Sequence, residues 1–218
     1  MPRFIEVSHP IEPGMKTYRG LPLPETKIIM DYDASRLRYG GQSEFLIASL
    51  HLCGNTGTYV DSPRHRYRDG VDLASLPLDS LAHLPVSKLD ARAREGRAID
   101  ATFFRDVDLG GKAVLINTGW NRYWRTELYL DQHPFLTRDA SELLVATGAR
   151  FVGIDSPNID DSHDPSRPAH TLLLGAGIPI CEHMTMLEQL EPGGFLHAVP
   201  IAWMGGASFP VRAYVVYL

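Results

Sequence analysis

The sequence predicts an α/β fold, because short apolar segments typical of buried strands alternate with segments typical of helices. Residues 113–117 and 151–154 are apolar on both faces, as in strands that are covered from both sides. Polar residues follow both segments directly, Thr118 after the first and Asp155 after the second. Strands that alternate with helices and end in polar side chains indicate an α/β domain.

The other elements are expected as follows. Residues 3–24 should begin with a short strand and continue as an irregular arm, because repeated Pro and Gly residues interrupt any helix there. Thr137 is the expected N-cap of a helix over residues 138–148, which ends at a glycine. The remaining predictions are a strand at 45–52, helical turns at 72–83 and 101–106, a helix at 170–177, a strand at 178–182 and a last strand at 214–217.

Length and composition are those of a soluble enzyme. At 218 residues and 44% hydrophobic, the chain can form a single domain, 1–218, with an N-terminal arm at about residues 1–25. A net charge of −5 with scattered Lys and Arg argues against a nucleic-acid partner. No signal peptide or membrane-length apolar run is visible, so no membrane partner is expected. Cys53 and Cys181 form no pair motif, which favours a cytoplasmic protein with free thiols.

The most informative segment is residues 55–65, Asn-Thr-Gly-Thr-Tyr-Val-Asp-Ser-Pro-Arg-His. It resembles the metal-binding signature of the cyclase and kynurenine formamidase-like hydrolases, His-x-Gly-Thr-His-x-Asp-x-Pro-x-His. Asn55 and Tyr59 stand where that family has histidines, and the family's first metal site rests on this pair. The resemblance therefore supports the fold and questions the activity.

Four further blocks are similar to the same family. They are Val7–Ile11 with Gly14-Met15 and Tyr18-Arg19-Gly20, the segment Leu115–Trp124, the segment Val152–Pro157 with Asp160, and the pair His170 and Glu182 before a closing segment with Pro200 and Arg212. The resemblance covers nearly the whole chain. It implies a central twisted, barrel-like β core with flanking short helices, the swivelling β/β/α architecture. It also implies a small-molecule hydrolase or cyclase acting on amide, lactam or ester-like bonds, and a homodimer or homotetramer in which the arm packs on another subunit.

The resemblance assigns the family's site residues to individual positions of this chain. Its second metal site corresponds to Asp61, His170 and Glu182, a ligand set suited to one Zn²⁺, Mn²⁺ or Fe²⁺ ion. At the first site, Asn55 is a poor zinc ligand, and the phenol of Tyr59, with an ordinary pKa near ~10, must ionise to bind well. The resemblance gives His65 a role in proton transfer. Tyr18 and Asn55 are the expected substrate-binding residues.

Three functions remain open at this stage. The leading one is a hydrolase or cyclase that uses a single metal. The second is a metal-free lyase, isomerase or cyclase, in which Tyr59 and His65 perform acid–base catalysis and the carboxylates bind these two side chains instead of an ion. The third is a non-catalytic relative that binds a small molecule, which the retained ionisable residues disfavour.

Other polar and aromatic residues of the sequence are expected to be structural. The cluster Asp155, Asp160, Asp161, His163 and Asp164 is expected to be a solvated loop. Trp120, Tyr123 and Trp124 could line an aromatic pocket but are more typical of core residues. His51 lies too far along the strand before the motif to replace a missing ligand.

Overall fold

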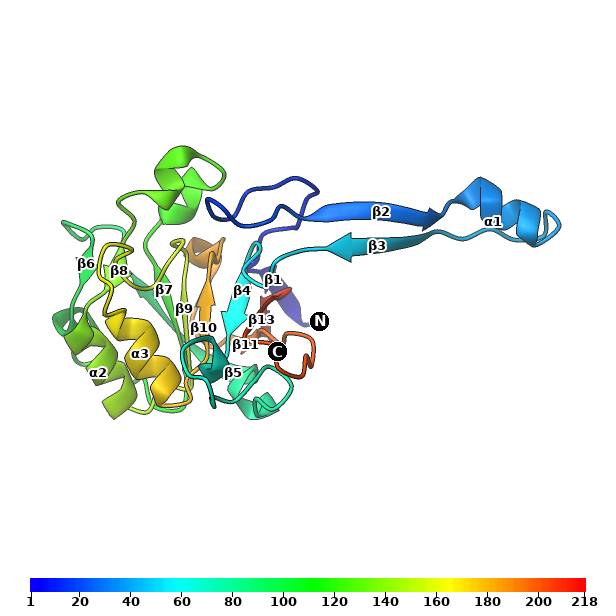
Figure 1. Ribbon diagram of the computed structural model, residues 1–218. Coiled ribbons are helices and arrows are strands. Elements are labelled where there is room, and N and C mark those ends of the chain that lie inside the picture. The colour runs from blue at the N-terminus through cyan, green and yellow to red at the C-terminus, as the bar shows by residue number, and fades with distance from the viewer.

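The computed structural model describes residues 1–218 and is built on one curved sheet of nine strands (Figure 1). The strands of this sheet are β1 (Arg3–Glu6), β4 (Tyr59–Asp61), β5 (Ala82–Asp90), β7 (Ala113–Asn117), β9 (Phe151–Ile154), β10 (Ile180–Glu182), β11 (Phe195–His197), β12 (Ser208–Pro210) and β13 (Tyr214–Tyr217). Their order across the sheet is β1-β13-β11-β5-β7-β9-β10-β4-β12. The pairs β5–β7, β7–β9 and β9–β10 are parallel, whereas both flanks are antiparallel.

Smaller elements surround this sheet. The helices are α1 (Tyr32–Arg38), α2 (Arg138–Ala146) and α3 (Pro168–Gly175). Short 3-10 turns are η1 (Pro63–His65), η2 (Leu78–Ser80), η3 (Ala101–Phe104), η4 (Trp120–Tyr123), η5 (Glu127–Leu130) and η6 (Leu187–Gln189). The two-stranded pairs are β2 (Glu25–Met30) with β3 (Ile47–His51), and β6 (Ala98–Ile99) with β8 (Phe135–Leu136). No helix is long and apolar enough to cross a membrane.

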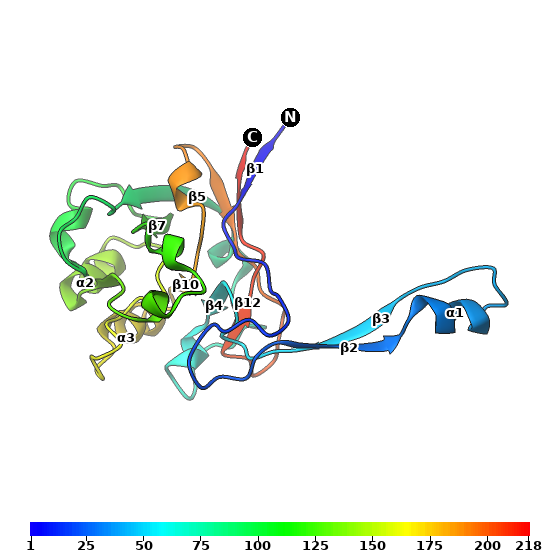
Figure 2. The same ribbon diagram turned by 90° about the horizontal axis from the view of Figure 1, so that it is seen from above.

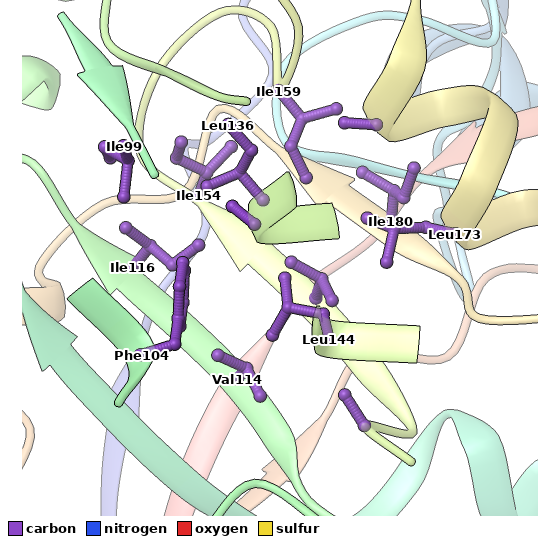
Figure 3. Packing of buried hydrophobic residues seen from close by; sticks show 14 of the residues in the cluster. Ile99, Phe104, Val114, Ile116, Leu136, Leu144, Ile154, Ile159, Leu173 and Ile180 are labelled. Carbon is purple, nitrogen blue, oxygen red and sulfur yellow. The ribbon is translucent and has the colours of Figure 1, made fainter. Parts of the chain in front are cut away.

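The parallel strands carry an apolar core on each face, because successive side chains of a strand point to opposite sides. On β7, Val114 and Ile116 belong to the core beneath α2 and α3, whereas Ala113 and Leu115 belong to the core on the other face. Figure 3 shows the helix-side core, in which Leu144 of α2 and Leu173 of α3 meet the strands. Burying each such Leu or Ile contributes roughly 1.5–3 kcal/mol, so these contacts fix the helices on the sheet.

The second face tolerates no side chain at Gly153 of β9. A Cβ atom there would collide with the sulfur of Met184 and would lie 2.8 Å from Cδ2 of Leu115. This close approach lets the segment after β10 pack directly on the sheet. It thereby fixes the backbone that follows Glu182, which is a site residue.

A long ribbon projects from the body of the protein. Strands β2 and β3 pair antiparallel, and α1 lies at their far end, well away from the sheet in both views (Figures 1 and 2). Asp31 caps α1 by accepting a hydrogen bond from the amide of Ala34 (2.8 Å). Much of the ribbon's apolar surface is exposed, including Ile28 (60%) and Leu37 (83%). An isolated two-stranded ribbon is marginally stable at best in water.

The predicted fold class is confirmed. The strands expected at 113–117 and 151–154 are β7 and β9, and the expected helices are α2 and α3 with slightly different ends. Thr137 is the N-cap of α2, but its hydroxyl bonds to Ile99 and Asp139 instead of the helix amides. Elements that were not expected from the sequence include the long strand β5, the strand β12 and the helix α1 in the ribbon.

Candidate active site

The site forms where β4 lies between β10 and β12. The antiparallel register places Tyr59 directly opposite Glu182 and Asp61 directly opposite Ser208. Directly opposed residues of paired strands project to the same face, with Cβ atoms about 4.5–5.5 Å apart. Strand pairing therefore brings together side chains that are more than a hundred positions apart in the sequence.

Asp61 is the centre of the site and is fully buried. Its Oδ1 accepts a hydrogen bond from the Ser208 hydroxyl, whereas its Oδ2 has no hydrogen-bond partner. The His170 Nε2 atom lies 3.6 Å from Oδ2, and the His65 Nδ1 atom lies 3.5 Å from Oδ1. Burial acts to raise the pKa of Asp61, but the two histidines and Ser208 lower it below its ordinary value. This carboxylate is charged and has one oxygen free for a ligand.

His170 lies in the first turn of α3, where Asp160 fixes it. The Asp160 carboxylate accepts hydrogen bonds from the amides of Ala169 (2.6 Å) and His170 (3.1 Å), so it caps the helix. It also lies 2.6 Å from the His170 Nδ1 atom. Burial acts to lower the pKa of His170, but the hydrogen bond to Asp160 and the nearby carboxylates of Asp61 and Glu182 raise it to about 10. The surroundings of this ring strongly favour a positive charge.

Ser208 determines which ring nitrogen of His65 carries the proton. Because the Ser208 hydroxyl gives its proton to Asp61, its oxygen can only accept from the His65 Nδ1 atom, 3.0 Å away. Neutral His65 is therefore protonated on Nδ1, and its Nε2 has a free lone pair. Burial lowers the pKa of His65, although the Asp61 charge opposes this. His65 presents a basic nitrogen, and a third of its side chain is exposed.

Glu182 is held from two sides. Its Oε1 accepts from the amide of Ile159 (2.7 Å), and its Oε2 accepts from the Tyr59 hydroxyl (2.5 Å). The Tyr18 hydroxyl lies 3.2 Å from that of Tyr59 and 3.5 Å from Oε2. Burial raises the pKa of Glu182 to about 7. The nearby His170 acts to lower this pKa, and the charge of Asp61 acts to raise it further. Burial and the Glu182 charge raise the pKa of Tyr59 well above its ordinary value, so Tyr59 remains a phenol.

Not every residue singled out in the sequence reaches this cluster. Six of these residues lie together and are linked by the contacts described above: Tyr18, Tyr59, Asp61, His65, His170 and Glu182. Asn55 lies half-buried in the turn before β4, and its side chain makes no hydrogen bond. His51 is exposed on β3.

The expectation of a solvated acidic loop at 155–164 is wrong for two of its members. Asp155 and Asp160 are buried, because each accepts hydrogen bonds from backbone amides: Asp155 from Thr118 and Gly119, and Asp160 at the start of α3. His163 is exposed, as expected. Trp120, Tyr123 and Trp124 are half-buried, and Trp124 packs edge-on against His183 beside the site.

Sequence reasoning assigned no role to Ser208 or His183, and it placed Asp160 in a solvated loop. Ser208 reaches Asp61 only through the pairing of β12 with β4, and nothing near it in the sequence signals this contact. Asp160 lies ten positions before His170, too far along the chain for the usual N-cap pattern, so its contact with the helix could not be read from the sequence. His183 is adjacent to Glu182 but belongs to no motif that indicates a role.

The residues present fit one divalent metal ion. Ligand atoms of Asp61, His65 and His170 lie within 4.8 Å of one another, and Asp61 Oδ2 is a buried acceptor without a partner. The Nδ1 atom of His170 faces a carboxylate, an arrangement that orients metal-binding histidines in other proteins. An imidazole and carboxylate set of this kind suits Zn²⁺, Mn²⁺ or Fe²⁺.

A second ion does not fit. The hydroxyl of Tyr59 points at Glu182 as a neutral donor. The two imidazole ligands of the family signature are absent, since Asn55 and Tyr59 stand at their positions. Both oxygens of Glu182 are already hydrogen-bonded. The two-metal arrangement implied by the resemblance is therefore reduced to one candidate ion position.

Comparison with known proteins identifies the family. The model of the putative cyclase family matches residues 5–161, so the chain belongs to the cyclase family, as the sequence predicted. The kynurenine formamidase of Salinibacter ruber is 28% identical over 211 residues, which cover 96% of this chain and 95% of the relative. The kynurenine formamidase of Bacillus cytotoxicus is 25% identical over 217 residues, covering 97% of this chain and 96% of the relative.

Solved structures share the fold at lower identity. An isatin hydrolase bound to the product analogue thioisatinate superposes with a TM-score of 0.83 at 22% identity, covering 99% of this chain and 92% of that one. A potential metal-dependent hydrolase with cyclase activity superposes with a TM-score of 0.79 at 24% identity, covering 99% and 98%. The predicted enzyme class, a hydrolase of this family, is the class of these relatives.

Proposed function

We propose that this protein hydrolyses amide or lactam bonds of small molecules with the help of one divalent metal ion. The observation that carries the proposal is the group Asp61, His65 and His170, with its unpartnered buried oxygen. Glu182, the third ligand expected from the sequence, has both oxygens hydrogen-bonded, so we assign it to proton transfer and His65 to the ion. A metal in this place would polarise the scissile carbonyl as a Lewis acid.

The chain's own residues account for the movement of the proton. A general base works best when its pKa is close to the working pH, and the pKa of Glu182 is raised to about 7. Glu182 can take a proton from the attacking water and return it to the leaving nitrogen. Tyr59 remains protonated and donates to Oε2, so it holds the carboxylate in a fixed orientation.

The substrate class follows from the surrounding rings. Tyr18, Tyr59 and Trp124 surround the ring of His183 with centroid distances of 5.2 to 5.5 Å, next to Glu182. Aromatic rings prefer other planar rings in stacked or edge-on arrangements. An aromatic amide or lactam is therefore the proposed substrate. The names of the relatives, kynurenine formamidase and isatin hydrolase, support the same class.

One observation favours a second candidate, a metal-free acid–base enzyme. The raised pKa of His170 means that an imidazolium can supply the positive charge that Asp61 and Glu182 require. In such an enzyme the Tyr59 phenol and Glu182 would exchange protons with a carbonyl substrate, as in a lyase, isomerase or cyclase.

Metal content and turnover of N-phenylformamide, a simple aromatic amide, distinguish these candidates. Protein purified without chelator should hold about one divalent ion per chain and should hydrolyse the amide. Asp61→Asn should lose both properties, whereas the exposed control Asp79→Asn should lose neither. Turnover that survives complete removal of metal would overturn the hydrolase proposal in favour of the metal-free one.

We also propose that the protein is a cytoplasmic homo-oligomer whose ribbon packs on another subunit. The exposed apolar residues Ile28 and Leu37 on the projecting β2–α1–β3 segment support this. Light scattering should give a dimer or larger species for the wild-type protein. The double variant Ile28→Lys with Leu37→Lys should be a monomer, unlike the control Leu78→Lys on the body. A monomeric wild type contradicts the proposal.

A further inference from the structure

The imidazole of His183 is a buried polar group that the proposed reaction leaves unused. It follows Glu182 directly and is completely inaccessible to solvent. Its backbone has φ +56°, a left-handed conformation that is uncommon for a histidine. Hydrogen bonds from Thr58 to its carbonyl and from its amide to Ser156 (3.1 Å) hold the backbone in this conformation. The ring is therefore fixed beside the reaction centre.

The hydrogen bonds around His183 define its protonation. The hydroxyl of Tyr129 lies 3.2 Å from the carbonyl oxygen of Asp155 and 3.1 Å from the His183 Nδ1 atom. A carbonyl oxygen can only accept, so the single proton of the Tyr129 hydroxyl goes to Asp155. The tyrosine oxygen then accepts from His183, whose proton is on Nδ1. Burial keeps this ring neutral by lowering its pKa well below the ordinary value.

The other nitrogen of the ring, Nε2, is consequently a buried acceptor, and it has no donor within reach. Leaving a buried polar atom without a partner costs about 1–3 kcal/mol, and folded proteins rarely do so without a reason. Tyr18, Tyr59 and Trp124 pack around the ring with their own aromatic groups. The atom thus marks a position where an aromatic ligand could supply an N–H group.

We propose that His183 Nε2 accepts a hydrogen bond from the N–H of a planar aromatic amide or lactam and so selects substrates that carry this group. The inference deepens the proposed function, on which it rests for the identity of the substrate. It makes His183 a specificity-determining residue, and Tyr129 a positioning residue that acts through it.

A ligand can reach His183 by replacing the ring of Tyr18, which lies edge-on to it. The segment that carries Tyr18 is bounded by Gly14 and Gly20, whose φ angles of +76° and +82° and open surroundings suit a hinge. On the outside, Lys16 and Arg19 hold this segment by exposed ion pairs to Glu127. Exposed ion pairs contribute little to stability, so the main interaction that a ligand must replace is the hydrogen bond from the Tyr18 hydroxyl to the Pro157 carbonyl.

Binding of unreactive probes tests the inference without relying on turnover. Indole and 3-methylindole carry the N–H group, whereas 1-methylindole lacks it but has the same size as 3-methylindole. Calorimetry on the wild-type protein should show that 1-methylindole binds at least about tenfold more weakly than the other two, the effect of one lost hydrogen bond. Tyr18→Ala should bind indole more tightly, because it removes the ring that covers the site.

Two variants assign this preference to His183. His183→Phe removes the acceptor and should bind 1-methylindole and 3-methylindole equally. Tyr129→Phe removes the group that fixes the proton on Nδ1, so the ring can also carry it on Nε2 and the preference should shrink. Tyr217→Phe, which alters a hydroxyl at Glu191, should retain the preference. The Tyr129 variant decides the question if a phenylalanine at the strained position 183 does not fold. Equal affinity for the methylindoles in the wild type, or an undiminished preference in Tyr129→Phe, overturns the inference.

The outcome is separable from that of the proposed function. A protein that prefers indole to 1-methylindole but never hydrolyses N-phenylformamide would refute the hydrolase and leave the role of His183 intact. A protein that hydrolyses the amide but binds the probes without preference would support the hydrolase and refute the role of His183.

Discussion

The Tyr59 hydroxyl lies 2.5 Å from the Oε2 atom of Glu182, at a position where the cyclase family has a metal-binding histidine. The register of β4 and β10 places these two residues opposite each other, so any side chain at position 59 meets Glu182. A histidine there would offer a lone pair to an ion, whereas the tyrosine offers a proton to the carboxylate. One substitution thus converts a ligand of a metal into a donor to a base.

Tyr59→Phe should shift the pH dependence of hydrolysis. The hydrogen bond from Tyr59 lowers the pKa of Glu182, so its loss should raise that pKa above about 7. Less Glu182 is then ionised at neutral pH, and the acidic limb of the kcat/KM profile should move to higher pH. Activity at high pH and metal content should change little. An unchanged profile would show that Glu182 is not the base.

Ser208→Ala should reduce turnover more than it affects substrate affinity. The variant removes the donor to Asp61 Oδ1 and allows His65 to carry its proton on either nitrogen. We expect kcat to fall by roughly tenfold or more and KM to change little, since the loss of one ordering hydrogen bond corresponds to about 1 kcal/mol or more. Ser80→Ala, a buried serine that bonds to Pro77 away from the site, is the matched control. Equal losses in both variants would indicate a general effect on stability.

Metal-free protein should become less stable as the pH rises from about 6.5 to about 10. The pKa of His170 is raised from its ordinary value of 6.5 to about 10 by folding, so the folded state holds the extra proton across this interval. Stability linked to this proton is complete below the unfolded pKa and is lost as pH rises through the folded one. The Tm of chelator-treated protein should therefore fall over this range, and His170→Gln should flatten the curve.

Metal binding should reverse this dependence, because an ion competes with the proton for the His170 Nε2 atom. Addition of the metal should release protons, measurable as a dependence of the binding heat on the ionisation heat of the buffer. A Tm that is the same at about pH 6.5 and about pH 9.5 in chelator-treated protein would show that His170 is neutral without the ion.

The α/β class could be predicted from local patterns, whereas the barrel-like architecture and the candidate site residues were inferred from the resemblance to the cyclase family. Buried strands such as β7 are continuous apolar runs. In the motif at 55–65, Asp61 and His65 are only four positions apart. The contribution of Ser208 could not be predicted, since it depends on which strand pairs with β4 and in which register. The partner of Tyr59 was open for the same reason. The pairing of β4 with β10 places Glu182 opposite position 59, and the phenol there is then a donor to the carboxylate.

Restoring the family's pair of histidines, Asn55→His with Tyr59→His, should create the missing ion position. Tyr59→His places an imidazole opposite Glu182 and removes the phenol that occupies one of its oxygens. Asn55 lies half-buried in the turn before β4 and has no side-chain hydrogen bond that the substitution would remove. Two imidazoles beside Asp61 and Glu182 complete a ligand set, and the metal content measured by elemental analysis should rise from about one ion per chain towards two.

The single variants are the controls, because each alone supplies an incomplete set. A double variant that folds, as judged by circular dichroism and Tm, but binds no additional metal would mean that the pocket differs from its relatives by more than these two side chains. If neither this variant nor the wild-type protein holds any metal, the metal-free mechanism, in which the phenol of Tyr59 is the acid, becomes the better account of this protein.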